Sequence, residues 1–131
     1  KKYNVLGKMV FLPFLDDLPA AYMLADVVVA PSLKPEPFGR VIIEAQAMGR
    51  PVISFDHGGA SESIKNNITG LLVEPKNEKE LGNAIEKLIN MTEIQRNNMA
   101  NSSRKHIVNK ISLDKMNRET IKLYSEILKI K

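Results

Sequence analysis

Four short apolar runs, separated by helical patterns, occupy the first ninety residues and limit the possible folds more than any other feature of the chain. These runs are rich in β-branched residues and predict strands at residues 9–12, 27–30, 52–55 and 71–73. Strands that alternate with helices form a parallel sheet covered by helices. Because the runs are almost entirely apolar, we expect strands that are buried on both faces. The pattern therefore predicts an α/β domain.

The helices that separate and follow these strands have recognisable start signals. Asp17 is a predicted N-cap for a helix over residues 18–24, a second helix begins after Gly39, and a helical turn is expected around residues 61–65. Two pairs with capping-box spacing open further helices. A last helix, over residues 113–130, carries an apolar stripe that we expect to pack against another surface. The pairs are Asn77 with Glu80 and Thr92 with Gln95, and the stripe is Leu113, Met116, Thr120, Leu123, Ile127 and Ile130.

Composition excludes several classes of function. A chain of 131 residues is long enough for one domain with a buried core. The absence of cysteine excludes disulfides and thiolate metal sites and fits a cytoplasmic protein. The net charge of +4 is a mild excess that a lysine-rich surface explains, and aromatic residues make up only 5% of the chain. We therefore expect no nucleic-acid partner, since few aromatic rings are available to stack on bases.

Residues 36–51 carry the most informative motif. Glu36 and Glu44 are separated by seven residues, and between them Pro37 and Gly39 mark the entry into an apolar helix. The first turn of a helix presents unpaired N–H groups and the positive end of a dipole, which suit a phosphate. Carboxylates accept hydrogen bonds from hydroxyl groups. The motif therefore suits a ligand with an anionic middle and hydroxyl-rich ends, such as a nucleotide-sugar.

The ordered set of motifs around this stretch resembles the family 4 retaining glycosyltransferases, which have two Rossmann-like domains (the GT-B fold) and bind the sugar donor in the C-terminal one. The resemblance covers roughly residues 10–90. Besides residues 36–51, it rests on Phe-Leu-Asp-Asp-Leu-Pro at 14–19, Ala-Asp-Val-Val-Val-Ala-Pro-Ser at 25–32, Gly-Arg-Pro-Val-Ile at 49–53, Gly-Gly-Ala-Ser-Glu at 58–62 and Asn-Ile-Thr-Gly-Leu-Leu-Val at 67–73.

The resemblance implies that residues 1–131 form part of a C-terminal, nucleotide-sugar-binding domain. The sheet would be Rossmann-like and would lack the family's opening strands and its basic pair for the donor diphosphate. The N-terminal domain, which would bind a glycan or lipid-linked acceptor, would lie outside this chain. We expect the isolated chain to be inactive and to self-associate through its uncovered surfaces.

The family's site residues can be carried over to matching positions. Glu36 would hold the transferred sugar and act as the catalytic residue, and Glu44 would bind the ribose hydroxyls. The resemblance implies that backbone N–H groups of the turn contact the sugar or the diphosphate, although Gly39 and Arg40 could also be an ordinary turn glycine and an exposed arginine. The full donor-binding set is Glu36, Pro37, Phe38, Gly39, Arg40, Val41 and Glu44.

Further candidates lie in two loops. His57, Gly58 and Gly59 follow the predicted strand at 52–55, at a strand end where open α/β sheets bind ligands. His57 could contact the substrate or be a bystander. Phe14 lies where the family places the nucleotide base, but Pro13 replaces the usual glycine and removes an N–H. We expect no metal site and no cofactor, since this family needs no divalent ion.

The sequence therefore predicts the donor-binding part of a retaining glycosyltransferase that uses a nucleotide-diphospho-sugar, with a role in cell-envelope polysaccharide or lipopolysaccharide synthesis. Two alternatives stay open. One is a non-enzymatic module that binds a nucleotide or a partner, and the other is a glycosidase that uses two carboxylates. The expected location is the cytoplasm, and the mild basicity leaves open a peripheral association with the inner face of the cytoplasmic membrane.

Overall fold

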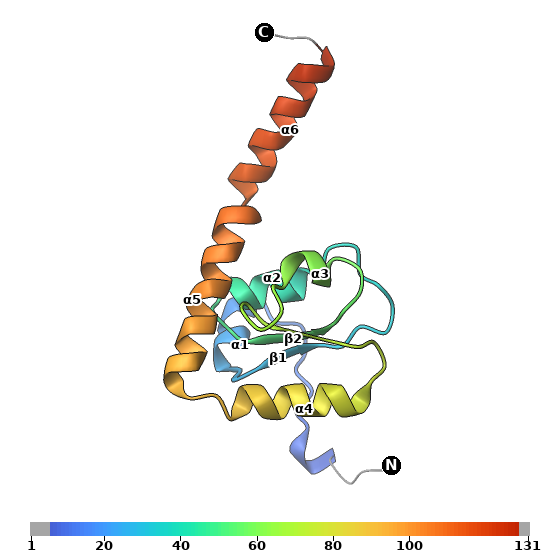
Figure 1. The fold of residues 1–131 in the computed structure, drawn as a ribbon, viewed down its shortest axis with the longest axis vertical. Helices are drawn as coiled ribbons and strands as arrows, with labels where there is room; N and C mark the ends of the chain where they lie inside the picture. The colour runs from blue at the N-terminus through green and yellow to red at the C-terminus, as the bar shows by residue number, and fades with distance from the viewer. Residues whose placement is uncertain (1–5, 129–131) are drawn as a thin grey trace.

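The centre of the structure is a three-stranded parallel sheet with the order β1-β2-β3. The computed structural model describes residues 6–128, and its strands are β1 (Val28–Ala30), β2 (Val52–Phe55) and β3 (Leu71–Val73). In the register, Val28 lies opposite Val52 and Ile53 lies opposite Leu71. Helices α2 and α3 cover one face of the sheet, and α4 covers the other (Figure 1). The predicted α/β class with a Rossmann-like parallel sheet is confirmed.

Two apolar clusters explain why the strands are continuous apolar runs. On one face, Ile53 packs in a cluster with residues of α4 and α5, and on the other face Val52 packs with residues of α2 and α3. Because neighbouring residues of a strand point to opposite faces, a central strand needs apolar side chains at every position. The buried members are Ile53, Phe55, Leu71, Val73, Ala84, Leu88 and Met99 in the first cluster, and Ile42, Ala45, Val52, Ala60 and Ile64 in the second.

The six α-helices of the described range lie where the sequence predicts helices, and one short 3₁₀ helix, η1, was not predicted. Asp17 caps α1 by accepting a hydrogen bond from the Ala20 N–H at 3.0 Å, and Thr92 and Gln95 form a complete capping box. The predicted box at Asn77 is only half formed, because the Glu80 carboxylate accepts from the Glu74 N–H instead. The helices are η1 (Leu6–Lys8), α1 (Leu18–Leu24), α2 (Arg40–Ala47), α3 (Ala60–Ser63), α4 (Glu78–Ile89), α5 (Glu93–Lys110) and α6 (Leu113–Leu128).

The predicted strand at residues 9–12 is wrong. This segment forms no strand, and its apolar side chains are exposed, with Val10 82% and Phe11 79% exposed. A strand needs a neighbour that completes its backbone hydrogen bonds. Among residues 6–128, this segment pairs with neither edge of the sheet, which consists of β1, β2 and β3. An apolar pattern alone therefore does not produce a strand.

Helix α6 forms where the sequence predicts it, but its apolar stripe stays largely exposed in the described part of the chain. It leaves the body of the domain as an extension in line with α5 (Figure 1), and none of its residues between Leu113 and Leu128 is buried. Leu123 and Ile127 of the predicted stripe are 55% and 65% exposed, and Ile130 lies outside the described residues. None of the helices between residues 6 and 128 is long and apolar enough to cross a membrane.

A buried polar network joins α2 and α5 and holds both against the sheet. The Ser103 hydroxyl shares its one proton between the Thr69 carbonyl at 2.8 Å and the Met99 carbonyl of α5 at 2.7 Å, and the Gln46 side chain donates to the Thr69 carbonyl at 3.3 Å. All four residues are buried, and such groups are costly when they lack partners. The network therefore fixes the position of α2, the helix that carries Glu44.

We expect the stability of the domain to fall in mild acid because of His106. This residue of α5 is buried, and burial together with Lys65 and Lys110 lowers its pKa below the ordinary value of 6.5. The unfolded chain therefore binds an extra proton below about pH 6.5, so stability is present in full above that pH and is lost as the pH falls towards the lowered pKa. Urea unfolding at pH 7.5 and 5.5 measures this loss. If His106→Gln lost as much stability between the two pH values as the unchanged protein, groups other than His106 would cause the pH dependence.

Candidate functional site

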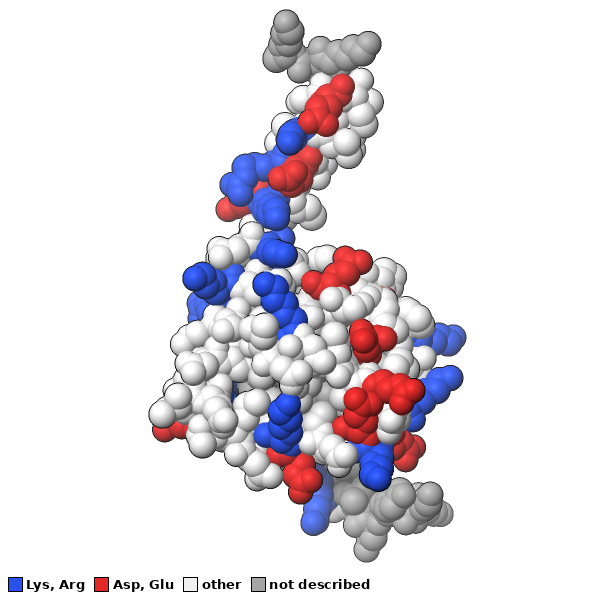
Figure 2. Space-filling model, viewed as in Figure 1, with Lys and Arg blue, Asp and Glu red and all other residues white. Residues whose placement is uncertain are grey.

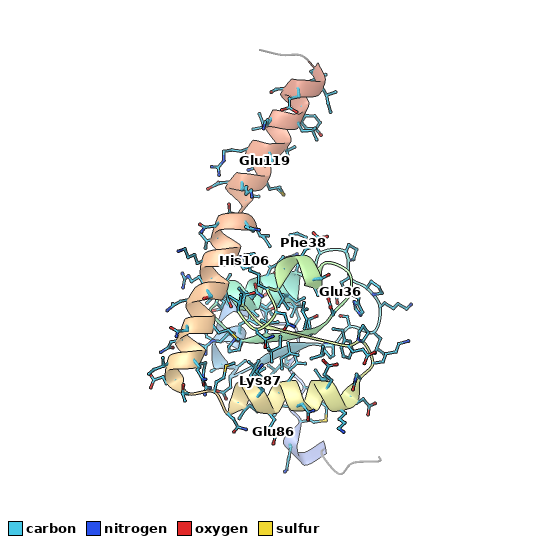
Figure 3. All side chains as sticks on the ribbon, viewed as in Figure 1. Glu36, Phe38, Glu86, Lys87, His106 and Glu119 are labelled. Carbon is cyan, nitrogen blue, oxygen red and sulfur yellow. The ribbon has the colours of Figure 1, made fainter. Side chains whose placement is uncertain are left out.

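The loops that follow β1 and β2 meet at the same end of the sheet and bring the predicted site residues together. The loop after β1 carries Glu36, and the loop after β2 carries the glycine pair. The Gly59 N–H donates a hydrogen bond to the Glu36 carbonyl at 2.8 Å, which joins the two loops. Figure 3 shows Glu36 and Phe38 beside α3, where the loops leave the sheet. The carboxyl ends of parallel strands therefore build one shared edge, as the sequence predicts for His57, Gly58 and Gly59.

The glycine pair is required by how closely the two loops pack. A Cβ atom on Gly58 would lie 2.5 Å from the Glu36 carbonyl oxygen, and one on Gly59 would lie 2.6 Å from the Pro37 carbonyl oxygen. Gly58 also has φ of +56°, a conformation that other residues rarely adopt. The pair therefore lies beneath the backbone of the loop that carries Glu36 and supports that loop directly.

The carboxylate of Glu36 is exposed and belongs to a small polar group. It accepts a hydrogen bond from the Ser32 hydroxyl, and the His57 Nε2 lies 2.9 Å from the Ser32 carbonyl oxygen. Because a carbonyl oxygen only accepts, Nε2 must carry the proton. Nδ1 of His57 is buried and has no partner among the described residues. His57 thus fastens the loop through Ser32, and Glu36 lines a small hollow that includes Ser32, Ser54 and His57.

Helix α2 begins at the site with an open N-terminus. Its N-cap residue, Gly39, has φ of +70°, and no side chain in the described range caps the helix. Gly39 is thus required by a left-handed backbone, which explains the glycine independently of ligand approach. The side chains of Phe38 and Val41 are 55% and 42% exposed, and Pro37 is also exposed. The first-turn N–H groups and the dipole end of α2 form a feature that suits an anion.

Glu44, one turn further along α2, has each of its oxygens in a hydrogen bond. The Arg40 guanidinium donates to Oε1 at 2.9 Å, and the Tyr22 hydroxyl donates to Oε2 at 3.1 Å. The Arg40 side chain is 83% exposed, whereas Tyr22 in α1 is partly buried. Burial and the neighbouring Glu44 carboxylate raise the pKa of Tyr22 to about 12, so the phenol stays a proton donor at neutral pH. Sequence reasoning did not identify Tyr22.

A second hollow, of about 850 Å³, lies between α2 and α3 on one side and the junction of α5 with α6 on the other. Glu44, Arg40 and Phe38 line it from the site, and Lys110 and Met116 line it from the other side. Glu36 lines the smaller hollow and not this one. The two glutamates of the motif therefore line different hollows, and the one at Glu36 is small, about 10 Å³. On the face seen in Figure 2, basic side chains lie along α5, acidic and basic side chains are interleaved on α6, and most acidic side chains of the body lie on the side away from α5.

The structure also shows where Phe14 lies and whether acidic side chains cluster. Phe14 lies in the exposed segment before α1, and 92% of its surface is accessible, so the described residues do not enclose it. Asp17 caps α1, and residues 6–128 contain no group of three or more histidine or acidic side chains that could hold a metal ion.

Comparison with known proteins gives consistent matches over most of the chain. The family model for glycosyl transferases group 1 matches residues 1–106. An uncharacterised glycosyltransferase of Methanocaldococcus jannaschii is 38% identical over 92% of this chain, and the capsular polysaccharide biosynthesis glycosyltransferase CapM of Staphylococcus aureus is 36% identical over 92%. This chain spans 31% of the length of each of these two relatives.

A solved structure agrees with the sequence matches. Anabaena HepE in complex with UDP-glucose has a TM-score of 0.82 and 31% identity, covering 88% of this chain and 32% of the Anabaena chain. The family model and the solved structure confirm the resemblance to two-domain glycosyltransferases that the ordered motifs indicate. The chain belongs to the group 1 family of glycosyl transferases.

Proposed function

We propose that this chain is the donor-binding part of a glycosyltransferase that transfers a sugar from a nucleotide-diphospho-sugar to a glycan or lipid-linked acceptor, with retention of anomeric configuration. The observation that carries the proposal is that Glu36, the glycine pair and the open N-terminus of α2 lie together where the loops leave the carboxyl ends of β1 and β2, with Glu44 one turn further along α2. A second domain, outside these residues, would bind the acceptor. Residues 1–131 alone would not transfer sugar, because the reacting groups are never brought together.

The roles of the residues follow the order of groups in such a donor. The diphosphate would lie at the N-terminus of α2, where the N–H groups of Gly39 and Arg40 provide positive partial charge. Glu36 would accept hydrogen bonds from sugar hydroxyls, and Glu44 would accept them from the ribose. The UDP-glucose complex of the similar Anabaena protein supports a nucleotide-sugar as the ligand.

Several parts of the proposal concern the wider setting of the protein. The name of the similar Staphylococcus aureus protein supports a role in cell-envelope polysaccharide synthesis. A cytoplasmic protein associated peripherally with the membrane would meet a lipid-linked acceptor there. Catalysis would rest on positioning and on charge stabilisation by this chain's own groups, without a resident metal or cofactor.

The two alternative functions are less well supported. A two-carboxylate glycosidase holds its carboxyl groups about 5–9.5 Å apart around one glycosidic bond. In this chain Glu36 and Glu44 line different hollows, and Glu44 is already paired with Tyr22 and Arg40. That arrangement suits two ends of an extended ligand better than one bond. A non-enzymatic module would keep the fold and could bind nucleotide without transferring sugar.

Removal of the Glu44 carboxylate tests the proposed ribose contact. In the complete protein, we expect Glu44→Ala to weaken binding of uridine diphosphate by about 1.5–3 kcal/mol, because hydrogen bonds from the ribose to a charged acceptor are lost. Binding of 2′,3′-dideoxyuridine diphosphate should change little. Isothermal titration calorimetry with both ligands measures the difference.

Glu86→Ala is the matched control, because Glu86 is an exposed glutamate of α4 on the other face of the sheet. It should leave both affinities unchanged. Equal losses for the two ligands in Glu44→Ala would contradict the ribose role. A protein that binds no ribonucleoside diphosphate at all would contradict the proposed function.

A further inference from the structure

We propose that Tyr22 is a positioning residue that holds the Glu44 carboxylate in the orientation needed to bind the ribose. The inference rests on the proposed function, because it concerns the same ligand group. It adds a residue from a different helix, 22 positions earlier in the chain. Tyr22 itself need not touch the ligand, since it acts through Glu44.

The two hydrogen bonds to Glu44 differ in how firmly they are held. The Tyr22 ring packs against the buried cluster beneath α2, which includes Ile42 and Ala45, so its hydroxyl is held by packing. The Arg40 side chain is 83% exposed and makes its bond at the surface. Exposed ion pairs contribute little, because water and salt compete with them. Oε2 is therefore held by the protein, whereas a ligand hydroxyl can replace the guanidinium at Oε1.

Tyr22 limits the conformations of a flexible side chain before the ligand arrives. A free glutamate side chain has several rotamers, and ordering it on binding costs free energy. The bond of Tyr22 Oη to Oε2 at 3.1 Å is made in the unliganded protein, so this cost is met during folding. The phenol keeps its proton at neutral pH, and it therefore acts as a constant donor. The expected result is a binding site with one oxygen of Glu44 turned towards the ligand.

Removal of one hydroxyl tests the inference. In the complete protein, we expect Tyr22→Phe to weaken binding of uridine diphosphate about two- to tenfold, the range of a single hydrogen bond. The affinity for 2′,3′-dideoxyuridine diphosphate should stay the same, because that ligand lacks the hydroxyls that Glu44 would bind. Tyr124→Phe, which changes an exposed tyrosine of α6, is the matched control and should alter neither affinity.

A double-mutant cycle separates positioning from a general structural effect. If Tyr22 acts through Glu44, Tyr22→Phe should cause no further loss of uridine diphosphate binding in the Glu44→Ala background. Equal losses for both ligands, or additive losses in the double variant, would overturn the inference. The proposed function would survive that result as long as the unchanged protein prefers the ribose ligand over the dideoxy ligand. Failure of the unchanged protein to bind any ribonucleoside diphosphate would refute both.

Discussion

Gly58→Ala is expected to destabilise the protein by about 3 kcal/mol and to abolish most donor binding. The new Cβ would lie 2.5 Å from the backbone oxygen of Glu36, in a residue whose φ is +56°. A backbone atom cannot rotate away as a side chain can, so the loop that carries Glu36 must move. Urea unfolding would measure the stability, and calorimetry with uridine diphosphate would measure binding.

Gly82→Ala provides the matched control for this substitution. Gly82 lies in α4, and a Cβ there would meet nothing within 4 Å. Alanine favours a helix by about 1 kcal/mol over glycine, so this variant should be slightly more stable and bind the ligand normally. A Gly58→Ala protein as stable as the Gly82→Ala protein would show that the loops can separate without cost.

Glu36→Gln is expected to reduce turnover of the complete protein with its nucleotide-sugar by about 10- to 150-fold. The change keeps the shape of the side chain but removes its charge, and hydrogen bonds from sugar hydroxyls to a charged acceptor contribute about 1.5–3 kcal/mol. Affinity for uridine diphosphate, which has no sugar to be transferred, should change much less. Steady-state kinetics with the whole donor and calorimetry with the diphosphate measure the two effects.

A control and a stereochemical reading complete this experiment. Glu86→Gln removes an exposed charge in α4 and should leave turnover unchanged. NMR of the early product should show that the anomeric configuration is kept. If nucleotide affinity fell as much as turnover in Glu36→Gln, Glu36 would belong near the phosphate or the base and not near the sugar.

The strands show what local pattern can and cannot predict. β2 and β3 have the predicted bounds, and β1 begins one residue later than predicted. Helices that the sequence also encodes bury β2 fully, most of β3, and β1 in part. Residues 9–12 have a similar composition but form no strand. Burial and pairing depend on a neighbouring element, and the composition of a run does not reveal whether that neighbour is present. The same limit applies to α6, whose helix was predicted correctly but whose packing was not.

In the candidate site, too, some features can be predicted from the sequence and others cannot. Glu36, Gly39 and Glu44 could be identified because their spacing lies within one continuous motif. The contacts of Tyr22 with Glu44 and of His57 with Ser32 join residues 22 and 25 positions apart, so they depend on how the helices and loops pack. No local pattern encodes such distances. A tyrosine in an amphipathic helix is by itself indistinguishable from an ordinary core residue.

The exposed helix α6 carries an intrinsic fluorescent probe, Tyr124. The chain has no tryptophan and three tyrosines, so its intrinsic fluorescence arises from the tyrosine rings. Tyr22 is partly buried under α2, whereas Tyr124 on α6 is 60% exposed, and Tyr3 lies outside the described residues. If another protein surface packed against α6, the surroundings of Tyr124 would change and those of Tyr22 would not. In a protein that carries both Tyr3→Phe and Tyr22→Phe, Tyr124 is the one tyrosine left, and its emission would therefore report when another surface covers α6.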